Sequence, residues 1–383
     1  MDCFVELCEI ASPTGQERLV ADHLTARIKR LGYPVLEDDC AAPARAGAGN
    51  LLTVIEGRDH DPERAVAFCA HLDTVPHNEP IRVVREGGVL RSAGETILGA
   101  DNKAAVAVLI ALAERWALEP PPVDVEFLFT VAEEHGLRGA HAFDISALRS
   151  KRGYVLDHAS PIGEIITAAP TYKLIEAEFR GRSAHAGIRP EDGHSAIAAA
   201  ATAIAEMKLG RLDESTTANV GLIAGGSAAN VVAQTCHLTA EARSLDGARV
   251  AEVVAAINQA CAWGASAHGC DLDVAVSELF RGYRLGGREP SLSLAERAMA
   301  SRAITPVRRQ SGGGSDANAL RLAGYDALLL ANGTSANHTP DEAVTESALV
   351  EMVGLCAAIV ACAADPAESA GSSADPSGAS TTR

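Results

Sequence analysis

The first 168 residues alternate strand-type runs with helical segments, and this alternation limits the folds open to the chain. Apolar runs typical of buried strands occupy 65–70 and 123–132. Between them, the Ala-rich segment 101–118 has helical periodicity and is followed by prolines that end a helix. A shorter strand-type run follows at 153–157. Strands separated by helices predict an α/β domain with a largely parallel sheet.

A helix is also predicted near the N-terminus. Thr14 and Glu17 form the T-x-x-E pattern of a capping box, and an amphipathic segment follows that Gly32 ends. We therefore expect both side chains to bond to the backbone of the first helical turn.

The pattern changes at residue 169. From there to residue 280 the order is strand, helix, strand, strand, helix, strand, which is the ferredoxin-like βαββαβ arrangement of a complete small α+β domain. After residue 286 the α/β character returns, and the tail rich in Ser, Ala, Pro and Gly is expected to be disordered. The predicted division is 1–168 and 287–364 for a catalytic α/β domain, 169–286 for an inserted domain, and 365–383 for the tail.

Residues able to bind metal gather where strand-type runs end. The carboxyl ends of strands in an open α/β sheet converge on one crevice, so residues far apart in sequence can meet there. Two imidazoles and several carboxylates without a thiolate suit a catalytic zinc site, with cobalt or manganese as substitutes. The candidates are His71, Asp73, Glu133, Glu134, Asp157 and His338 at or after strands, and Asp101 at the start of a helix.

Each of these residues also has an explanation without metal. His71 could be a hydrogen-bonded core histidine, Asp101 a helix N-cap, and Glu133 with Glu134 part of a solvated loop. Their joint occurrence at predicted strand ends favours the metal site.

The composition excludes several other classes. A net charge of −17 argues against a nucleic-acid or anionic-membrane surface, and no run approaches the ~20 apolar residues that span a bilayer. The nine cysteines include no C-x-x-C pair, which fits neither a disulfide framework nor a zinc knuckle. The N-terminal residues lack the basic and apolar regions of a secretory signal, so we expect a cytoplasmic protein.

Six separated motifs carry a family resemblance that covers about residues 12–364. They are AHLDTVP (70–76), LGADNKAAVAVL (98–109), VAEEHGLRGA (131–140), YVLD (154–157), RSAHAGIRPEDGHSAI (182–197) and NHTPDEAV (337–344). Together they resemble the cocatalytic di-zinc peptidase family that contains peptidase T, glutamate carboxypeptidase and the aminoacylases. The resemblance implies two zinc ions per subunit in an α/β domain, interrupted by a βαββαβ lid through which two subunits form a homodimer.

The resemblance also implies individual roles. His71 and Asp157 would bind one metal ion, Glu134 and His338 the other, and Asp101 both. Asp73 would hydrogen-bond His71 and fix its orientation, and Glu133 would be the general base. Two metals ~3.5–4 Å apart lower the pKa of a shared water to about 7, so that it can attack an amide. The peptide bond from Asp101 to Asn102 is expected to be cis.

Three residues of the inserted domain resemble substrate contacts of the family. His185 would stabilise the tetrahedral oxyanion, in that family at the partner's active site, and Asn230 and Arg243 would contact a substrate carboxylate. Without the resemblance, Asn230 could be a turn residue and Arg243 an exposed strand charge. The Gly-rich turn 312–316 resembles a loop lining the family's substrate cleft, and it could equally be a plain turn before a helix.

Several functions remain open at this point. A serine hydrolase is disfavoured because no complete G-x-S-x-G elbow is present, and a binding protein on a peptidase fold would be favoured by a missing ligand. Asp157 stands where the carboxypeptidase-like members resemble one another in having Glu, and the motifs at 99–109 and 154–157 look most like peptidase T. We expect an aminopeptidase acting on di- or tripeptides, with N-acyl amino acid amidohydrolase or carboxypeptidase as the alternative.

Overall fold

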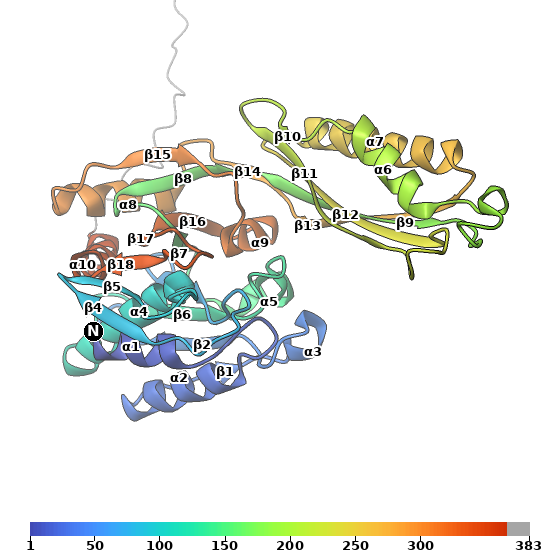
Figure 1. Ribbon diagram of the computed structural model, residues 1–383. Coiled ribbons are helices and arrows are strands. Elements are labelled where there is room, and N and C mark those ends of the chain that lie inside the picture. The colour runs from blue at the N-terminus through green and yellow to red at the C-terminus, as the bar shows by residue number, and fades with distance from the viewer. Residues whose placement is uncertain (366–383) are drawn as a thin grey trace, which may run out of the picture.

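The computed structural model describes residues 1–365, and residues 366–383, on which the predicted disordered tail falls, lie outside the described part. A main body (residues 1–169 and 283–365) is built on a nine-stranded sheet of order β1-β2-β6-β3-β7-β16-β8-β14, with β15 paired to β8 (Figure 1). Its strands are β1 (Leu36–Glu37), β2 (Leu51–Ile55), β3 (Val66–His71), β6 (Val125–Thr130), β7 (Arg152–His158), β8 (Glu164–Ala169), β14 (Tyr283–Arg284), β15 (Val307–Gln310) and β16 (Asp326–Ala331).

The four central strands, β6, β3, β7 and β16, are parallel to one another, and β2 and β8 flank them in antiparallel orientation. This confirms the predicted α/β class with a largely parallel sheet. The helices of the main body are α1 (Asp2–Glu9), α2 (Arg18–Arg30), α3 (Ala41–Ala44), α4 (Ala100–Leu118), α5 (Arg138–Ala142), α8 (Pro290–Ser301), α9 (Asp316–Leu322) and α10 (Glu346–Ala363).

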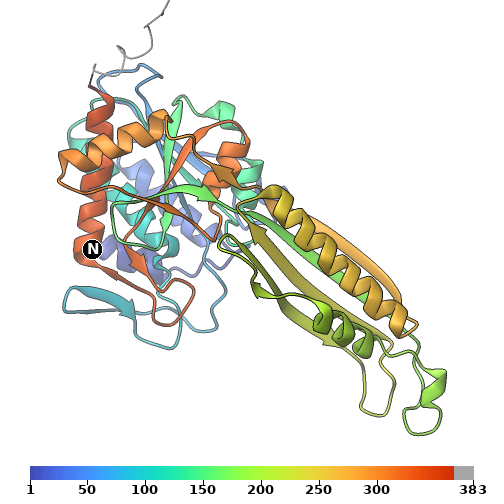
Figure 2. The ribbon, with the colours of Figure 1, turned by 90° about the horizontal axis from the view of Figure 1, so that it is seen from above.

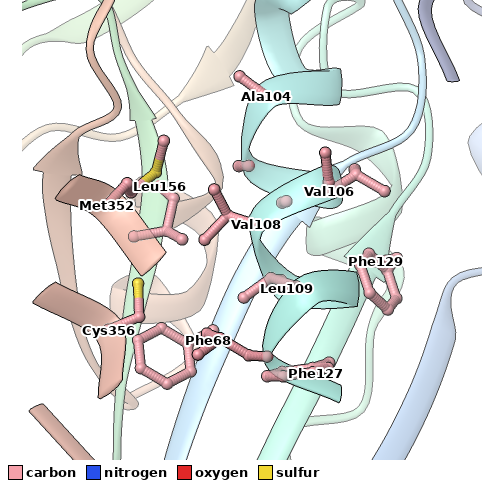
Figure 3. Packing of buried hydrophobic residues seen from close by; sticks show 14 of the residues in the cluster. Phe68, Ala104, Val106, Val108, Leu109, Phe127, Phe129, Leu156, Met352 and Cys356 are labelled. Carbon is pink, nitrogen blue, oxygen red and sulfur yellow. The ribbon is translucent and has the colours of Figure 1, made fainter. Parts of the chain in front are cut away.

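Helix α4 lies at the centre of the main hydrophobic core. Figure 3 shows Val108 of this helix beside Leu156 of β7 and Met352 of α10, with Phe127 of the sheet close to Leu109. Alanines at 104, 105 and 107 let the helix approach its neighbours closely, since a small side chain shortens the distance between packed elements. This close packing fixes the position of the N-terminal end of α4, which bears Asp101.

The 18 residues of helix α10 are long and apolar enough to cross a membrane by length and composition alone. Its residues Leu355, Cys356 and Ile359 are buried in the main core. A core helix of a globular protein meets the same criteria, so α10 is weak evidence for a membrane span.

The capping box predicted at Thr14 and Glu17 is absent. Helix α2 begins at Arg18 without a side-chain cap, and the buried carboxylate of Glu17 accepts hydrogen bonds from the backbone N–H groups of Gly15 and Gly47. The hydroxyl of Thr14 donates to Asp73 instead. Thr14 and one oxygen of Glu17 therefore bond to distant segments, and the other oxygen of Glu17 bonds to the turn just before the helix, so neither side chain caps α2.

A small four-stranded sheet of order β17-β18-β5-β4 was not predicted from the sequence. It consists of β4 (Val83–Glu86), β5 (Val89–Ser92), β17 (Thr334–Ser335) and β18 (Ala343–Thr345). Strand β18 pairs with β5, which ties the segment around His338 to the segment that leads into α4.

A second unit (residues 171–280, the projecting unit) extends sideways from the main body in both ribbon views (Figures 1 and 2). Its sheet has the order β10-β11-β12-β9-β13, and both helices cover one face around a separate hydrophobic core. The βαββαβ order is confirmed, with a short β10 added. The elements are β9 (Thr171–Arg180), α6 (Ala196–Glu206), β10 (Gly210–Arg211), β11 (Thr216–Gly225), β12 (Thr235–Ser244), α7 (Gly247–Ala267) and β13 (Asp271–Phe280).

The base of the projecting unit packs against the main body through a small apolar cluster. Phe280 at the end of β13 contacts the group formed by Leu137, Ala140 and Ala319. A Cβ on Gly314 would stand 2.3 Å from the Phe280 ring, so this turn accepts only glycine there. The contact joins the projecting unit to the loop that follows Glu134.

Candidate metal centre

The crevice predicted at the carboxyl ends of the strands is formed by the four central parallel strands. His71 is the last residue of β3, and Asp157 lies near the end of the adjacent β7. Glu133 and Glu134 follow β6, and His338 follows β16 on the loop between β17 and β18. Strand order therefore accounts for the meeting of residues that lie up to 267 positions apart, because the four strands end at the same edge of the sheet.

The ligand candidates form three groups, one of which joins His71 to Glu133 and Glu134, while the other two share Asp101. Of the two clusters that share Asp101, one contains His71, Asp101 and Asp157, and the other contains Asp101, Glu134 and His338. In the first, Nε2 of His71 is 3.2 Å from Oδ1 of Asp101 and 3.4 Å from Oδ1 of Asp157. In the second, Nε2 of His338 is 3.1 Å from Oδ2 of Asp101 and 2.9 Å from Oε1 of Glu134. Each oxygen of Asp101 thus faces a different imidazole.

Asp101 lies in a non-helical first turn of α4, and its peptide bond to Asn102 is cis, as expected. The side-chain amide of Asn102 donates a 3.2 Å hydrogen bond to Oδ1 of Asp157. Sequence reasoning assigned no role to the Asn102 side chain, although it is part of the motif at 98–109. Through this hydrogen bond the amide of Asn102 orients the carboxylate of Asp157, a candidate metal ligand.

The expected contact of Asp73 with His71 differs in detail. Nδ1 of His71 lies 2.9 Å from the backbone oxygen of Asp73 but 3.6 Å from its carboxylate, which is beyond hydrogen-bond distance. The carboxylate accepts hydrogen bonds from the backbone N–H groups of Glu133 and Glu134 at 3.0 and 3.2 Å, and from the hydroxyl of Thr14 at 2.8 Å. Asp73 therefore orients His71 through its main chain and the two glutamates through its side chain.

The charge balance of the site fits bound cations. Burial, with the charge of Asp157 second, raises the pKa of Glu133 well above its usual range, and burial with the charge of Asp101 does the same for Asp157. Burial alone would lower the pKa of His71, but Asp157 and Asp101 outweigh it and raise the pKa. Two imidazoles cannot neutralise four neighbouring carboxylates, and buried carboxylates without compensation are costly. Divalent cations between these side chains would remove that cost.

Glu133 and His338 differ in exposure. Glu133 is buried, and no hydrogen bond to its carboxylate occurs within residues 1–365. The side chain of His338 is 49% exposed, so the site opens to solvent on that side. A carboxylate without a hydrogen-bond donor, beside an open crevice, is available to take a proton from a reactant.

His185 and Asn230 lie together at the outer end of the projecting unit. The segment 181–195 between β9 and α6 is at the end furthest from the main body in both ribbon views (Figures 1 and 2). A β-bridge joins His185 to Val231, and the N–H of Ala186 donates to the oxygen of Asn230 at 2.9 Å. Both residues are exposed and remote from the metal centre of their own chain.

Arg243 lies at the opposite end of the projecting unit. In the sheet it is the partner of Tyr172, next to the junction with β8, and its guanidinium stacks 4.1 Å above the Tyr172 ring. Glu241 accepts hydrogen bonds from Nε and Nη2 of Arg243 at 3.3 and 2.9 Å. The structure therefore separates Arg243 from His185 and Asn230 within one chain.

Asp316 is a buried residue of the site region that the sequence analysis included only as the last residue of the Gly-rich turn 312–316, without a role of its own. Its carboxylate accepts a hydrogen bond from the Thr130 hydroxyl, while its Oδ1 is buried without a partner within the described chain. Burial raises the pKa of Asp316 to about 6. The signal in the sequence was its place two residues after three glycines, next to the N-cap Ser315, and the start of helix α9 explains that place equally well.

Comparisons with known proteins agree with this architecture. A peptidase dimerisation domain model matches residues 171–268, and a model of peptidase family M28 matches residues 50–158. The uncharacterized protein YqjE of Bacillus subtilis is 36% identical over 360 residues, covering 93% of this chain and 96% of that protein.

Two solved structures are also similar over nearly the whole chain. The aminopeptidase PepT of Bacillus cereus is 38% identical, with a TM-score of 0.81, over 94% of this chain and 97% of that one. A tripeptidase of Staphylococcus aureus is 33% identical, with a TM-score of 0.86, over 95% of this chain and 97% of that one. With this extent of likeness in sequence and fold, the chain belongs to the peptidase T-like family of peptidases.

Proposed function

We propose that this peptidase is a metal-dependent aminopeptidase that cleaves di- and tripeptides and holds two metal ions per subunit. The main observation behind this proposal is the position of Asp101, because one of its carboxylate oxygens faces His71 and the other faces His338. One carboxylate shared by two three-residue clusters suits two ions side by side. Nitrogen and oxygen ligands without a thiolate favour zinc, with cobalt or manganese as substitutes.

In this proposal His71, Asp101 and Asp157 hold one ion, and Asp101, Glu134 and His338 hold the other. The bound ions would supply Lewis acidity to the attacking water and the scissile carbonyl. Glu133 accepts the proton of that water and returns it to the leaving nitrogen, which its burial beside the clusters supports. Asp73 keeps the Glu133 backbone in place through its 3.0 Å hydrogen bond.

The substrate class is supported by the two solved peptidases that the chain resembles, an aminopeptidase and a tripeptidase. Arg243 presents a planar guanidinium at the base of the projecting unit, which suits the terminal carboxylate of a short peptide. A short peptide would then be held between this cation and the metal centre.

A hydrolysis panel tests this proposal directly. Metal is removed with a chelator, and Zn²⁺, Co²⁺ or Mn²⁺ is added back before free and N-acetylated di- and tripeptides are supplied. We expect chelation to abolish hydrolysis, metal to restore it, and cleavage to release the N-terminal residue of free peptides only. Cleavage restricted to N-acetylated substrates would instead assign a deacylase, release of the C-terminal residue a carboxypeptidase, and the absence of any hydrolysis a binding protein.

We further propose that two subunits form a homodimer through an inserted domain with limits near 169 and 286. The match of residues 171–268 to a peptidase dimerisation domain supports this. Within the described chain, residues 219–225 of β11 have no strand partner on the side away from β12, and Leu222 and Ile223 are 69% and 49% exposed. An open sheet edge bearing apolar side chains is suited to pairing with a second copy.

The separation of the candidate substrate contacts supports an active site shared between subunits. Strand β12 has ten residues, so at ~3.3 Å per residue the ends of this strand lie roughly 30 Å apart. One rigid projecting unit cannot bring both ends to one metal centre. In the proposed dimer, His185 and Asn230 therefore reach the partner's metal centre. A Leu222→Asp variant should lower the measured mass in light scattering from dimer to monomer, and an unchanged dimer would place the interface elsewhere.

We also propose a cytoplasmic location. All nine cysteines are free, and most are buried, as suits a reducing compartment. Fractionation of cells that produce the protein would test this, with recovery outside the cytoplasm as the contrary result.

A further inference from the structure

The N-terminus of α4 lacks a cap of its own. The first N–H groups of any helix have no acceptor inside the helix, and a Ser, Thr, Asp or Asn at the N-cap usually supplies one. Here the N-cap is Gly99, which has no side chain and takes a left-handed conformation with φ of 73°. The terminus is also buried, so solvent cannot replace the missing acceptor.

Glu342 supplies an acceptor to one N–H group of the first turn, that of Asp101, and to the two N–H groups just before the helix. Its Oε2 accepts hydrogen bonds from the N–H groups of Leu98 at 2.7 Å and Gly99 at 2.8 Å. Its Oε1 accepts a 2.8 Å hydrogen bond from the N–H of Asp101, 241 residues away in sequence. The side chain is 1% exposed. A carboxylate at a helix N-terminus also interacts favourably with the helix dipole.

Glu342 also belongs to the segment that carries His338. It follows His338 by four residues and immediately precedes β18, which pairs with β5. Its side chain therefore connects the backbone at Asp101 to the loop that bears His338. Oδ2 of Asp101 and Nε2 of His338 face each other at 3.1 Å across the metal centre.

We propose that Glu342 is a positioning residue of the metal centre, which fixes the Asp101 backbone so that its carboxylate faces both His71 and His338. This inference rests on the proposed two-metal function. Residues that orient metal ligands from behind typically contribute 10- to 100-fold to metal affinity. Glu342 acts on the shared ligand, so both ions depend on it.

Substitutions can distinguish the contributions of the two carboxylate oxygens of Glu342. In Glu342→Gln the single amide oxygen is expected to keep the two donors of Leu98 and Gly99, which leaves an NH₂ group against the N–H of Asp101. Glu342→Asp keeps the charge and both oxygens but is shorter by one methylene, so it cannot reach both groups of donors. Both variants should therefore disturb Asp101 while most of the helix cap remains.

The test measures metal affinity of the folded, metal-free protein by competition with a chelating dye, for zinc and for cobalt. Glu346→Gln is the matched control, because Glu346 lies four residues further on and pairs with Arg85 away from the clusters. Circular dichroism and the melting temperature of the metal-free proteins report folding separately. We expect Glu342→Gln to weaken binding of both ions by about 10-fold or more, and Glu346→Gln to match the wild type.

The outcomes distinguish this inference from the proposed function. If the wild-type protein takes up no metal, the proposed function fails and this inference with it. If the wild type binds two ions and a folded Glu342→Gln binds them within about twofold of the wild type, only the role of Glu342 is overturned. If Glu342→Gln does not fold, the same comparison is decided by Glu342→Asp. A melting temperature that falls while metal affinity stays unchanged would reduce Glu342 to a helix cap.

Discussion

The metal centre and the outer end of the projecting unit contain candidate functional residues in opposite settings. At the metal centre, His71 and Asp157 are nearly buried, and hydrogen bonds from several elements hold the side chains. At the outer end, His185 and Asn230 are exposed, and the main-chain bridge of their two loops holds them. Side chains that bind a metal ion must already have the right geometry before the ion binds. An exposed side chain can instead be fixed in place later, when a second subunit buries it.

This difference divides the proposed site into a part that one chain completes and a part that two chains complete. The metal clusters need only the main body. Arg243, at the base of the projecting unit, lies between these extremes at 27% side-chain exposure. Substitutions at Glu133, His185 and Arg243 test this division, and a substitution at Asp316 tests the cost of a buried carboxylate beside the metal centre.

The largest effect is expected from Glu133→Gln. The substitution keeps the size of the side chain but removes the proton acceptor, so kcat should fall by ~10²–10⁴. Metal content, measured by mass spectrometry, should remain at two ions per subunit. Loss of one ion from this variant would mean that Glu133 is a ligand, and the roles of Glu133 and Glu134 would have to be exchanged.

His185→Ala should lower kcat by ~10²–10³, with KM little changed, because an oxyanion donor acts mainly in the transition state. Mixing inactive Glu133→Gln subunits with inactive His185→Ala subunits tests where His185 acts. A dimer with one subunit of each kind contains one complete site, so activity should return. Mixed dimers that form and stay inactive would contradict an active site shared between two chains. His185 would then act in the active site of its own chain or have no part in catalysis.

Arg243→Ala should weaken kcat/KM by ~10–100-fold for peptides with a free C-terminal carboxylate, since hydrogen bonds to charged groups contribute about 1.5–3 kcal/mol. Peptides with a C-terminal amide serve as the internal control and should lose little. Equal losses for both substrates would indicate that Arg243 supports the base of the projecting unit through Tyr172 rather than binding the substrate.

The smallest effect concerns stability and Asp316. Its pKa of about 6 in the fold lies above the ordinary value of 3.8, so folding favours the protonated form. That stabilisation is present below about pH 4 and is lost as the pH rises through about 6. Asn cannot ionise, so metal-free Asp316→Asn should gain on the order of 2 kcal/mol relative to the wild type between pH 4.5 and 7. Denaturant unfolding at both pH values measures this, and a constant difference would contradict it.

Local patterns were sufficient to predict the elements that bring the ligands together. Apolar runs followed by His71, by Glu133 and by Asp157 predicted strands of a parallel sheet, and a parallel sheet forces their carboxyl ends to one edge. The six motifs then distinguished these residues from ordinary loop acids. The cis bond at Asp101 was predicted only through the family resemblance.

Contacts between distant segments could not be predicted in the same way. The short strands β17 and β18 have two and three residues, too few for a periodic pattern, and they form because β18 pairs with β5 and β17 pairs with β18. Glu17 has the spacing of a capping box, but the N–H groups of Gly15 and Gly47 are its partners. Glu342 caps a helix 241 residues away, and no local rule connects the two.

The position of β16 within the sheet has a consequence for how the protein is made. This strand comes late in the chain, at residues 326–331, yet it lies between β7 and β8, which were translated long before. A nascent chain on the ribosome therefore holds an incomplete sheet while the intervening 171–280 segment, with a core of its own, emerges and can fold. His338 follows β16, so the second cluster of ligands closes only after both the main-body strands and the projecting unit have been synthesised.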